Sequence, residues 1–241
     1  MISKLPSKFT TVKNHLRRVG FYRTRTILRM LWYRHLHGHE VRPAFGLITV
    51  NPTEVEEYLS PRFGPQSYVF DIKDGDWDRT RPKPIKEYDM YRAFENHFTR
   101  GVPWEETEFY QRILDQIESG KTKWGCTSEA QFQEVCQKFD ALHDSILEYG
   151  FLSMEELHEQ GLASDRPVHA NEVCVAIGRD GTLFSDEGRH RLFLAKVLRL
   201  NKIPARVLVR HESWQQIRDQ AIAGESPLSG YRSHPDIKDI M

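Results

Sequence analysis

The segment spanning residues 173–211, VCVAIGRDGTLFSDEGRHRLFLAKVLRLNKIPARVLVRH, constrains the fold more than any other part of the chain. Its β-branched and apolar runs predict strands over 173–177, 182–184 and 202–211, with a hairpin-type turn at the sequence RDG between the first two. Apolar residues at helical spacing predict a helix over 189–200. The expected order is strand, turn, strand, charged turn, helix, strand, which is typical of an α+β fold with a small mixed β-sheet.

Charge is concentrated where the second strand of this segment gives way to the helix. Gly188 permits a tight turn, and the first backbone N–H groups of the helix then point outward beside Arg189, His190 and Arg191. Such groups bind phosphate, and arginine adds bidentate contacts to its oxygens. Cationic side chains at a helix N-terminus are unfavourable for the helix itself. The turn therefore predicts a phosphate-binding site.

Two carboxylates, Asp186 and Glu187, directly precede this turn. Beside a bound phosphate, either carboxylate is a candidate catalytic base or magnesium ligand. The alternative is a local network of salt bridges between these two acids and the arginines that follow.

An acidic loop, DIKDGDWD, occupies residues 71–78 and carries four aspartates. Carboxylates are the ligands that magnesium prefers, so Asp76 and Asp78 are candidate metal ligands. The alternative is an ordinary Asp-Gly turn with solvated acids. A magnesium role on a phosphate bound at the turn requires this loop to lie near Gly188.

The rest of the chain divides into an opening strand and a helical block. Residues 47–50 form a short β-rich run, after which Asn51 and Pro52 suit the start of a helix. Residues 87–161 have helical spacing throughout, with a Ser-x-x-Glu capping box at Ser153. The aromatic residues of this block, three and four apart, are interpreted as core.

The net charge of zero conceals a strong asymmetry. Residues 1–43 hold ten Lys or Arg against one acid, Glu40, so this segment carries +9 and the remainder −9. We expect a basic, helical N-terminal arm over 1–43, a body over 44–211 with a helical insertion at about 75–140, and a C-terminal helix and tail over 212–241. The arm predicts contact with nucleic acid, with an anionic membrane surface, or with the acidic body itself.

Other features bound the protein class. No run of about 18 apolar residues predicts a transmembrane segment, and the first residues lack the apolar core of a secretion signal. The three cysteines, Cys126, Cys136 and Cys174, never form a C-x-x-C pair, which favours reduced thiols and a cytoplasmic protein. The sequence leaves the oligomeric state open.

The segment 173–209 resembles the core of the ParB/sulfiredoxin superfamily, whose members carry a glycine, a basic pair and an alanine-bearing helix in this order. The upstream sequence FDALHDSILEYGFL is similar to that superfamily's preceding helix, and LITVNPTEV resembles its opening strand. The resemblance implies a small α/β fold that binds nucleotide phosphates at Gly188–Arg191. Family chemistries include CTP hydrolysis, sulfinic-acid repair and phosphorylation of free serine.

Two departures from the superfamily narrow its chemistries. Sulfiredoxins place a catalytic cysteine directly after the glycine, and this chain has Arg189 there, which argues against sulfinic-acid repair. Partition proteins continue into a DNA-binding domain, and the 30 or so residues after the last strand are too few for that domain. Three classes of function remain: a nucleotide-dependent phosphotransferase or hydrolase, a nucleotide switch without turnover, and a nucleic-acid-binding protein that uses the basic arm.

Overall fold

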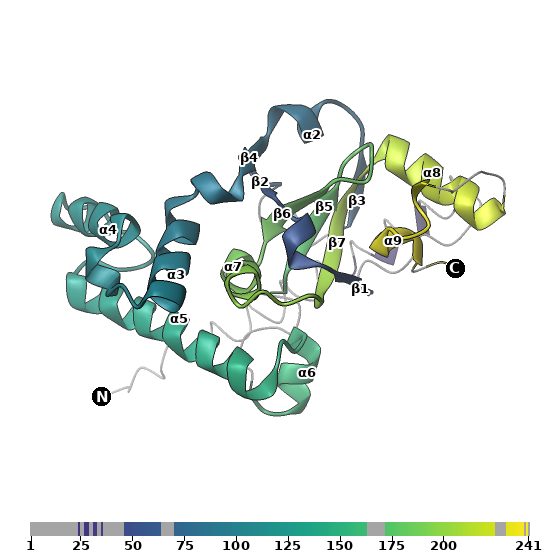
Figure 1. Ribbon diagram of the computed structural model, residues 1–241. Coiled ribbons are helices and arrows are strands. Elements are labelled where there is room, and N and C mark those ends of the chain that lie inside the picture. The colour runs from purple at the N-terminus through teal and green to yellow at the C-terminus, as the bar shows by residue number, and fades with distance from the viewer. Residues whose placement is uncertain are drawn as a thin grey trace, which may run out of the picture.

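The computed structural model describes residues 46–63, 70–162, 172–224, 230–238 and 240, together with six helical residues of the N-terminal arm. Over these residues the chain folds into a mixed β-sheet with helices on both sides, which confirms the predicted α+β class (Figure 1).

The described strands form one seven-stranded sheet. Its order is β1-β7-β5-β6-β2-β4, and β3 also pairs with β7. The strands are β1 (Leu47–Val50), β2 (Glu57–Leu59), β3 (Asp71–Lys73), β4 (Pro82–Pro84), β5 (Cys174–Ile177), β6 (Leu183–Glu187) and β7 (Ile203–His211). β1 is antiparallel to β7, whereas β3 and β5 run parallel to it.

The strands expected from sequence are present at β1, β5, β6 and β7, and three further strands are each only three residues long. A three-residue strand is too short to show an alternating pattern. β4 begins and ends with proline, which lacks a backbone donor and is tolerated here because β4 lies at the end of the sheet order. The helix predicted after β1 is a short 3-10 helix, Pro52–Glu54, and the Asn51 side chain caps it by accepting from the Thr53 N–H.

Helix α7 (Arg189–Val197) follows β6 directly, and the helical block packs against it. The block consists of α3 (Asp89–Arg100), α4 (Glu108–Glu118), α5 (Glu129–Tyr149) and α6 (Met154–Glu159). Thr107, Ser128 and Ser153 cap three of these helices, and the capping box at Ser153 is confirmed. The block lies within the predicted helical stretch 87–161, and the edge strand β4 precedes it.

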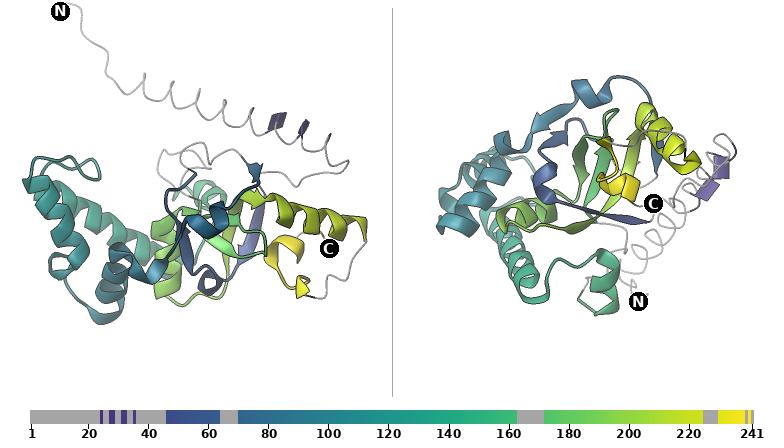
Figure 2. Two further views of the ribbon diagram at one scale, coloured as in Figure 1. Left: turned by 90° about the horizontal axis from the view of Figure 1, so that it is seen from above. Right: turned by 45° about the vertical axis from the view of Figure 1, so that its right-hand side comes forward.

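Two further helices lie on the other side of the sheet. Figures 1 and 2 show α8 (Glu212–Ala223) and α9 (Pro235–Lys238) at the end of the molecule opposite the helical block. The buried carboxylate of Asp236 accepts from Arg210 of β7 at 2.7 and 2.9 Å and from the Trp214 indole at 2.9 Å. These contacts hold α8 and α9 against β7.

Only Thr24, Ile27, Leu28, Leu31, Trp32 and His35 are described in the predicted arm, and all six are helical. The side chains of Ile27, Leu28, Leu31 and Trp32 are exposed. The remainder of residues 1–43 lies outside the described residues. No helix in the described part of the chain is both long and apolar enough to cross a membrane.

Candidate functional site

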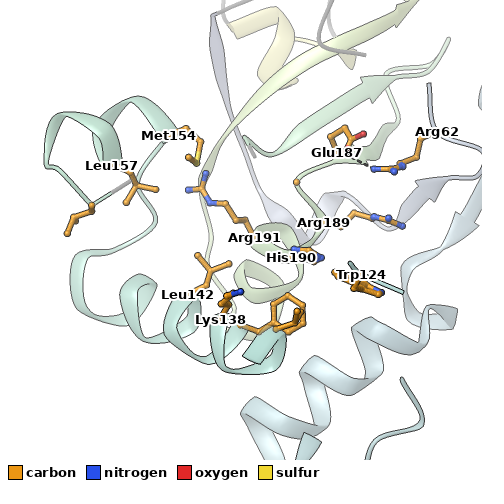
Figure 3. Close-up of a pocket in the computed structure, with 14 residues that line it drawn as sticks. Arg62, Trp124, Lys138, Leu142, Met154, Leu157, Glu187, Arg189, His190 and Arg191 are labelled. Carbon is orange, nitrogen blue, oxygen red and sulfur yellow. Dashed lines mark hydrogen bonds and ion pairs between the residues drawn. The ribbon is translucent and has the colours of Figure 1, made fainter. Parts of the chain in front are cut away.

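A cavity of about 540 Å³ lies between the N-terminal turn of α7 and the helical block (Figure 3). The turn contributes Glu187, Gly188, Arg189, His190 and Arg191. The remaining lining residues are Arg62, Trp124, Val135, Lys138, Phe139, Leu142, Met154, Leu157 and Leu162. The four predicted phosphate-binding residues therefore border one cavity, which also has an extensive apolar wall.

Gly188 is required at this turn for two reasons. Its φ of +72° lies in the left-handed region, which other residues rarely adopt. A Cβ at this position would also collide with the backbone just before β5, coming within 2.7 Å of Val173 Cα and closer still to the carbonyl of Glu172. The glycine lets β6 pass directly into α7, and within the described part of the chain no side chain caps the helix there.

Arg189 is anchored by Tyr88. Its Nη1 donates to the Tyr88 hydroxyl at 3.0 Å, and its guanidinium lies 5.0 Å from the centre of the same ring. Within the described part of the chain, no carboxylate lies at ion-pair distance from Arg189. The contact with a neutral phenol orients the guanidinium without neutralising its charge.

Arg191, two positions later, is held differently. Its side chain is buried, with the residue 5% exposed, and Nη1 donates to Glu172 at 3.1 Å. Nη2 donates to the carbonyl of Leu152, and the guanidinium lies 4.4 Å from the centre of the Phe151 ring. Burial raises the pKa of Glu172, an effect that the charge of Arg191 opposes. Arg191 lines the cavity but fixes α7 to the segment before α6.

His190 belongs to an aromatic cluster. Its ring is 5.2 Å from that of Trp124, at an interplanar angle of 30°, and 4.9 Å from that of Phe139. Trp124 and Lys138 were not predicted as site residues, because both come from the helical block and only the packing of that block on α7 places them here. No local sequence motif indicates this.

The two predicted catalytic carboxylates lie on different sides of β6. Glu187 lines the cavity and receives a hydrogen bond from Arg62 at 2.6 Å. Asp186 is fully buried, accepts from the Phe63 N–H at 3.1 Å and does not line the cavity. Burial raises the pKa of Asp186 to about 6. Of the two, Glu187 is therefore the carboxylate available to a ligand in the cavity.

The acidic loop surrounds an arginine instead. Arg179 donates to Asp78 through Nε at 2.8 Å and through Nη2 at 2.7 Å, and Nη2 also reaches Asp76 at 2.8 Å. Burial alone would raise the pKa of Asp78, but the hydrogen bonds from Arg179 outweigh it and hold this pKa below its usual range.

Arg179 and Gly188 flank β6, whose five residues extend over about 16 Å. In the described part of the chain, no group of three or more His, Cys, Asp or Glu side chains could hold a metal ion. The magnesium role of Asp76 and Asp78 stays a prediction, and this geometry gives it no support.

Comparisons with protein-family models, with curated proteins and with solved structures found no significant match to this chain.

Proposed function

We propose that this protein binds a nucleoside di- or triphosphate in the cavity at the N-terminal turn of α7. The observation that carries the proposal is the charge of the lining: among the described residues that line the cavity, Arg62, Lys138, Arg189 and Arg191 are cationic and Glu187 alone is a carboxylate. Arg62 pairs with that carboxylate and Arg191 with Glu172. Within the described part of the chain, neither Arg189 nor Lys138 has a carboxylate at ion-pair distance.

The backbone adds to this attraction for an anion. α7 has nine residues, with no capping side chain and no acidic residue in its first turn. The first N–H groups of an α-helix have no partner within the helix, and the helix dipole makes its N-terminus positive. Phosphate oxygens would accept from these groups while Arg189 and Lys138 neutralise their charge.

The order of elements supports a relationship with the ParB/sulfiredoxin superfamily as part of this proposal. β5, the turn at Arg179, β6, the Gly188 turn, α7 and β7 follow one another as the resemblance implies. The helical block is additional to that pattern and supplies the apolar wall of the cavity.

Turnover would require a general base beside the phosphates. Glu187 is the carboxylate in the lining, and the Arg62 guanidinium, 2.6 Å away, orients it. Phosphoryl transfer depends mainly on positioning and electrostatic stabilisation, which the cations of the turn would supply. Product analysis after incubation with each nucleotide separates turnover from binding alone.

The proposal is tested by calorimetric titration of the full chain with ATP, GTP, CTP, UTP and inorganic tripolyphosphate. We expect at least one nucleotide to bind, and Arg189→Ala to weaken that binding at least tenfold, because a charge-assisted hydrogen bond contributes about 1.5–3 kcal/mol. Arg199→Ala, an exposed arginine just after the other end of α7, is the matched control and should leave affinity unchanged. Absence of binding, or a folded Arg189→Ala variant with normal affinity, would contradict the proposal.

A further inference from the structure

The turn that carries Trp124 has an unusual backbone. Lys123 and Cys126 bond to each other through both backbone pairs, at 3.0 and 2.7 Å, and the two residues between them have positive φ, +55° at Trp124 and +78° at Gly125. Positive φ at both central residues is the signature of a type I′ turn, where Asn, Asp and Gly are preferred. A bulky tryptophan at the first of these positions is an outlier.

Three ring contacts hold the indole in this conformation. The ring stacks on His190 at 5.2 Å and meets Phe109 and Phe139 edge-on, each at 5.9 Å. Phe109 and Phe139 are buried, whereas Trp124 remains 40% exposed and lines the cavity (Figure 3). The turn thus directs a large aromatic surface into the cavity at the cost of backbone strain, a combination that is concentrated at ligand-binding sites.

We infer that Trp124 is the stacking surface for the base of the bound nucleotide, an inference that rests on the proposed function. The ring stacked on Trp124 belongs to His190, which lies in the first turn of α7 next to Arg189. A base on the exposed indole therefore lies beside the turn that receives the phosphates. Aromatic side chains stack on any base, because every base presents a π-face.

The neighbouring side chains suit the same arrangement. Val135, Phe139 and Leu142 of α5 form the apolar wall, and Lys138 of the same helix brings a cation to it. A volume of about 540 Å³ is in the range of small-molecule sites. Inorganic phosphates would contact only the cations and backbone N–H groups of the lining, whereas a nucleotide would also cover the indole of Trp124.

The test compares ATP, GTP, CTP and UTP with inorganic tripolyphosphate by titration calorimetry on the full chain. Trp124→Asn places a residue that type I′ turns prefer at this position and removes the ring. We expect nucleotide affinity to fall about tenfold, as loss of one base-stacking contact does, with tripolyphosphate affinity unchanged. Trp124→Phe should retain most of the nucleotide affinity.

Trp124→Leu keeps apolar bulk without a π-face and covers the case in which the asparagine variant fails to fold. It should show the same selective loss. Two results would overturn the stacking role. In the first, folded Trp124→Asn or Trp124→Leu binds nucleotides as tightly as the wild type does. In the second, the variant loses affinity for nucleotides and for tripolyphosphate equally. Arg189→Ala should lower both affinities, so its result separates this failure from a failure of the proposed function itself.

Discussion

The two ends of β6 each place an arginine beside a glycine turn and a pair of acids, yet the two arginines are used in opposite ways. At the first end, Arg179 donates to Asp76, Asp78 and the carbonyl of Gly75. At the other end, Arg189 donates to the neutral hydroxyl of Tyr88, and the nearby carboxylate of Glu187 is paired with Arg62.

The difference shows how pairing separates a structural charge from a binding one. A cation whose donors already meet carboxylates gains little from an anionic ligand, because the ligand would have to displace those partners. A cation oriented by a neutral group keeps its charge for the ligand. The sequence motifs, RDG and GRHR, are both basic glycine turns and do not distinguish the two cases.

The largest expected effect concerns the buried ion pair of Glu172 and Arg191. Arg191 lies in the binding turn, but like Arg179 its guanidinium is already paired with a carboxylate. Glu172→Ala leaves Arg191 buried without a counter-charge and should reduce the free energy of unfolding by about 3–5 kcal/mol. Glu187→Ala, which removes a carboxylate from the more exposed pair with Arg62, should cost less than about 1 kcal/mol. Urea denaturation measures the free energy of unfolding of each variant. Similar losses in the two variants would contradict the distinction between a buried structural arginine and one at the binding site.

The second effect concerns the proton on Asp186, at the Gly188 end of β6. Burial raises its pKa to about 6, above the ordinary value of about 3.9 in the unfolded chain. The folded state therefore binds this proton more tightly, and stability should decrease by about 2–3 kcal/mol as the pH rises from about 4 to 6, then remain level. Asp186→Asn should remove this decrease. Chemical denaturation across that pH range tests it, and parallel profiles for variant and wild type would exclude the effect.

The third effect separates the two ends directly. Asp78→Asn weakens a charge-assisted hydrogen bond from Arg179 and should lower stability by about 1–2 kcal/mol, with nucleotide affinity unchanged, because the two ends are separated by β6. The magnesium hypothesis makes a different prediction: Asp76→Asn and Asp78→Asn would abolish magnesium-dependent turnover. Thermal unfolding together with product analysis decides between them.

The smallest effect concerns the basic arm. Ile27, Leu28, Leu31 and Trp32 are exposed, so deletion of residues 1–34 should change the free energy of unfolding by less than about 0.5 kcal/mol. Loss of cooperative unfolding after the deletion would show instead that the arm stabilises the body. Nucleotide affinity should be unaffected in either case, because the described lining residues start at Arg62.

Local patterns predicted the elements with long apolar runs and the conformation of the Gly188 turn. They could not predict β2, β3 and β4, whose stability comes from pairing with distant strands. They also treated Arg189 and Arg191 alike. The two residues differ because their side chains leave α7 in different directions. Arg189 reaches Tyr88 and Arg191 reaches Glu172, and neither partner belongs to α7. Trp124 likewise reaches the site only through the packing of the helical block.

Amide hydrogen exchange tests the central claim most directly, because the first N–H groups of α7 have no partner within the helix. Exchange would be followed with and without saturating ATP, GTP, CTP and UTP in turn. We expect a bound nucleotide to slow exchange at the amides of Arg189, His190 and Arg191 and to leave the amides of Arg179 and Asp180, at the other end of β6, unchanged. Unchanged exchange at the α7 amides in the presence of a bound nucleotide would contradict the assignment of this turn as the phosphate site.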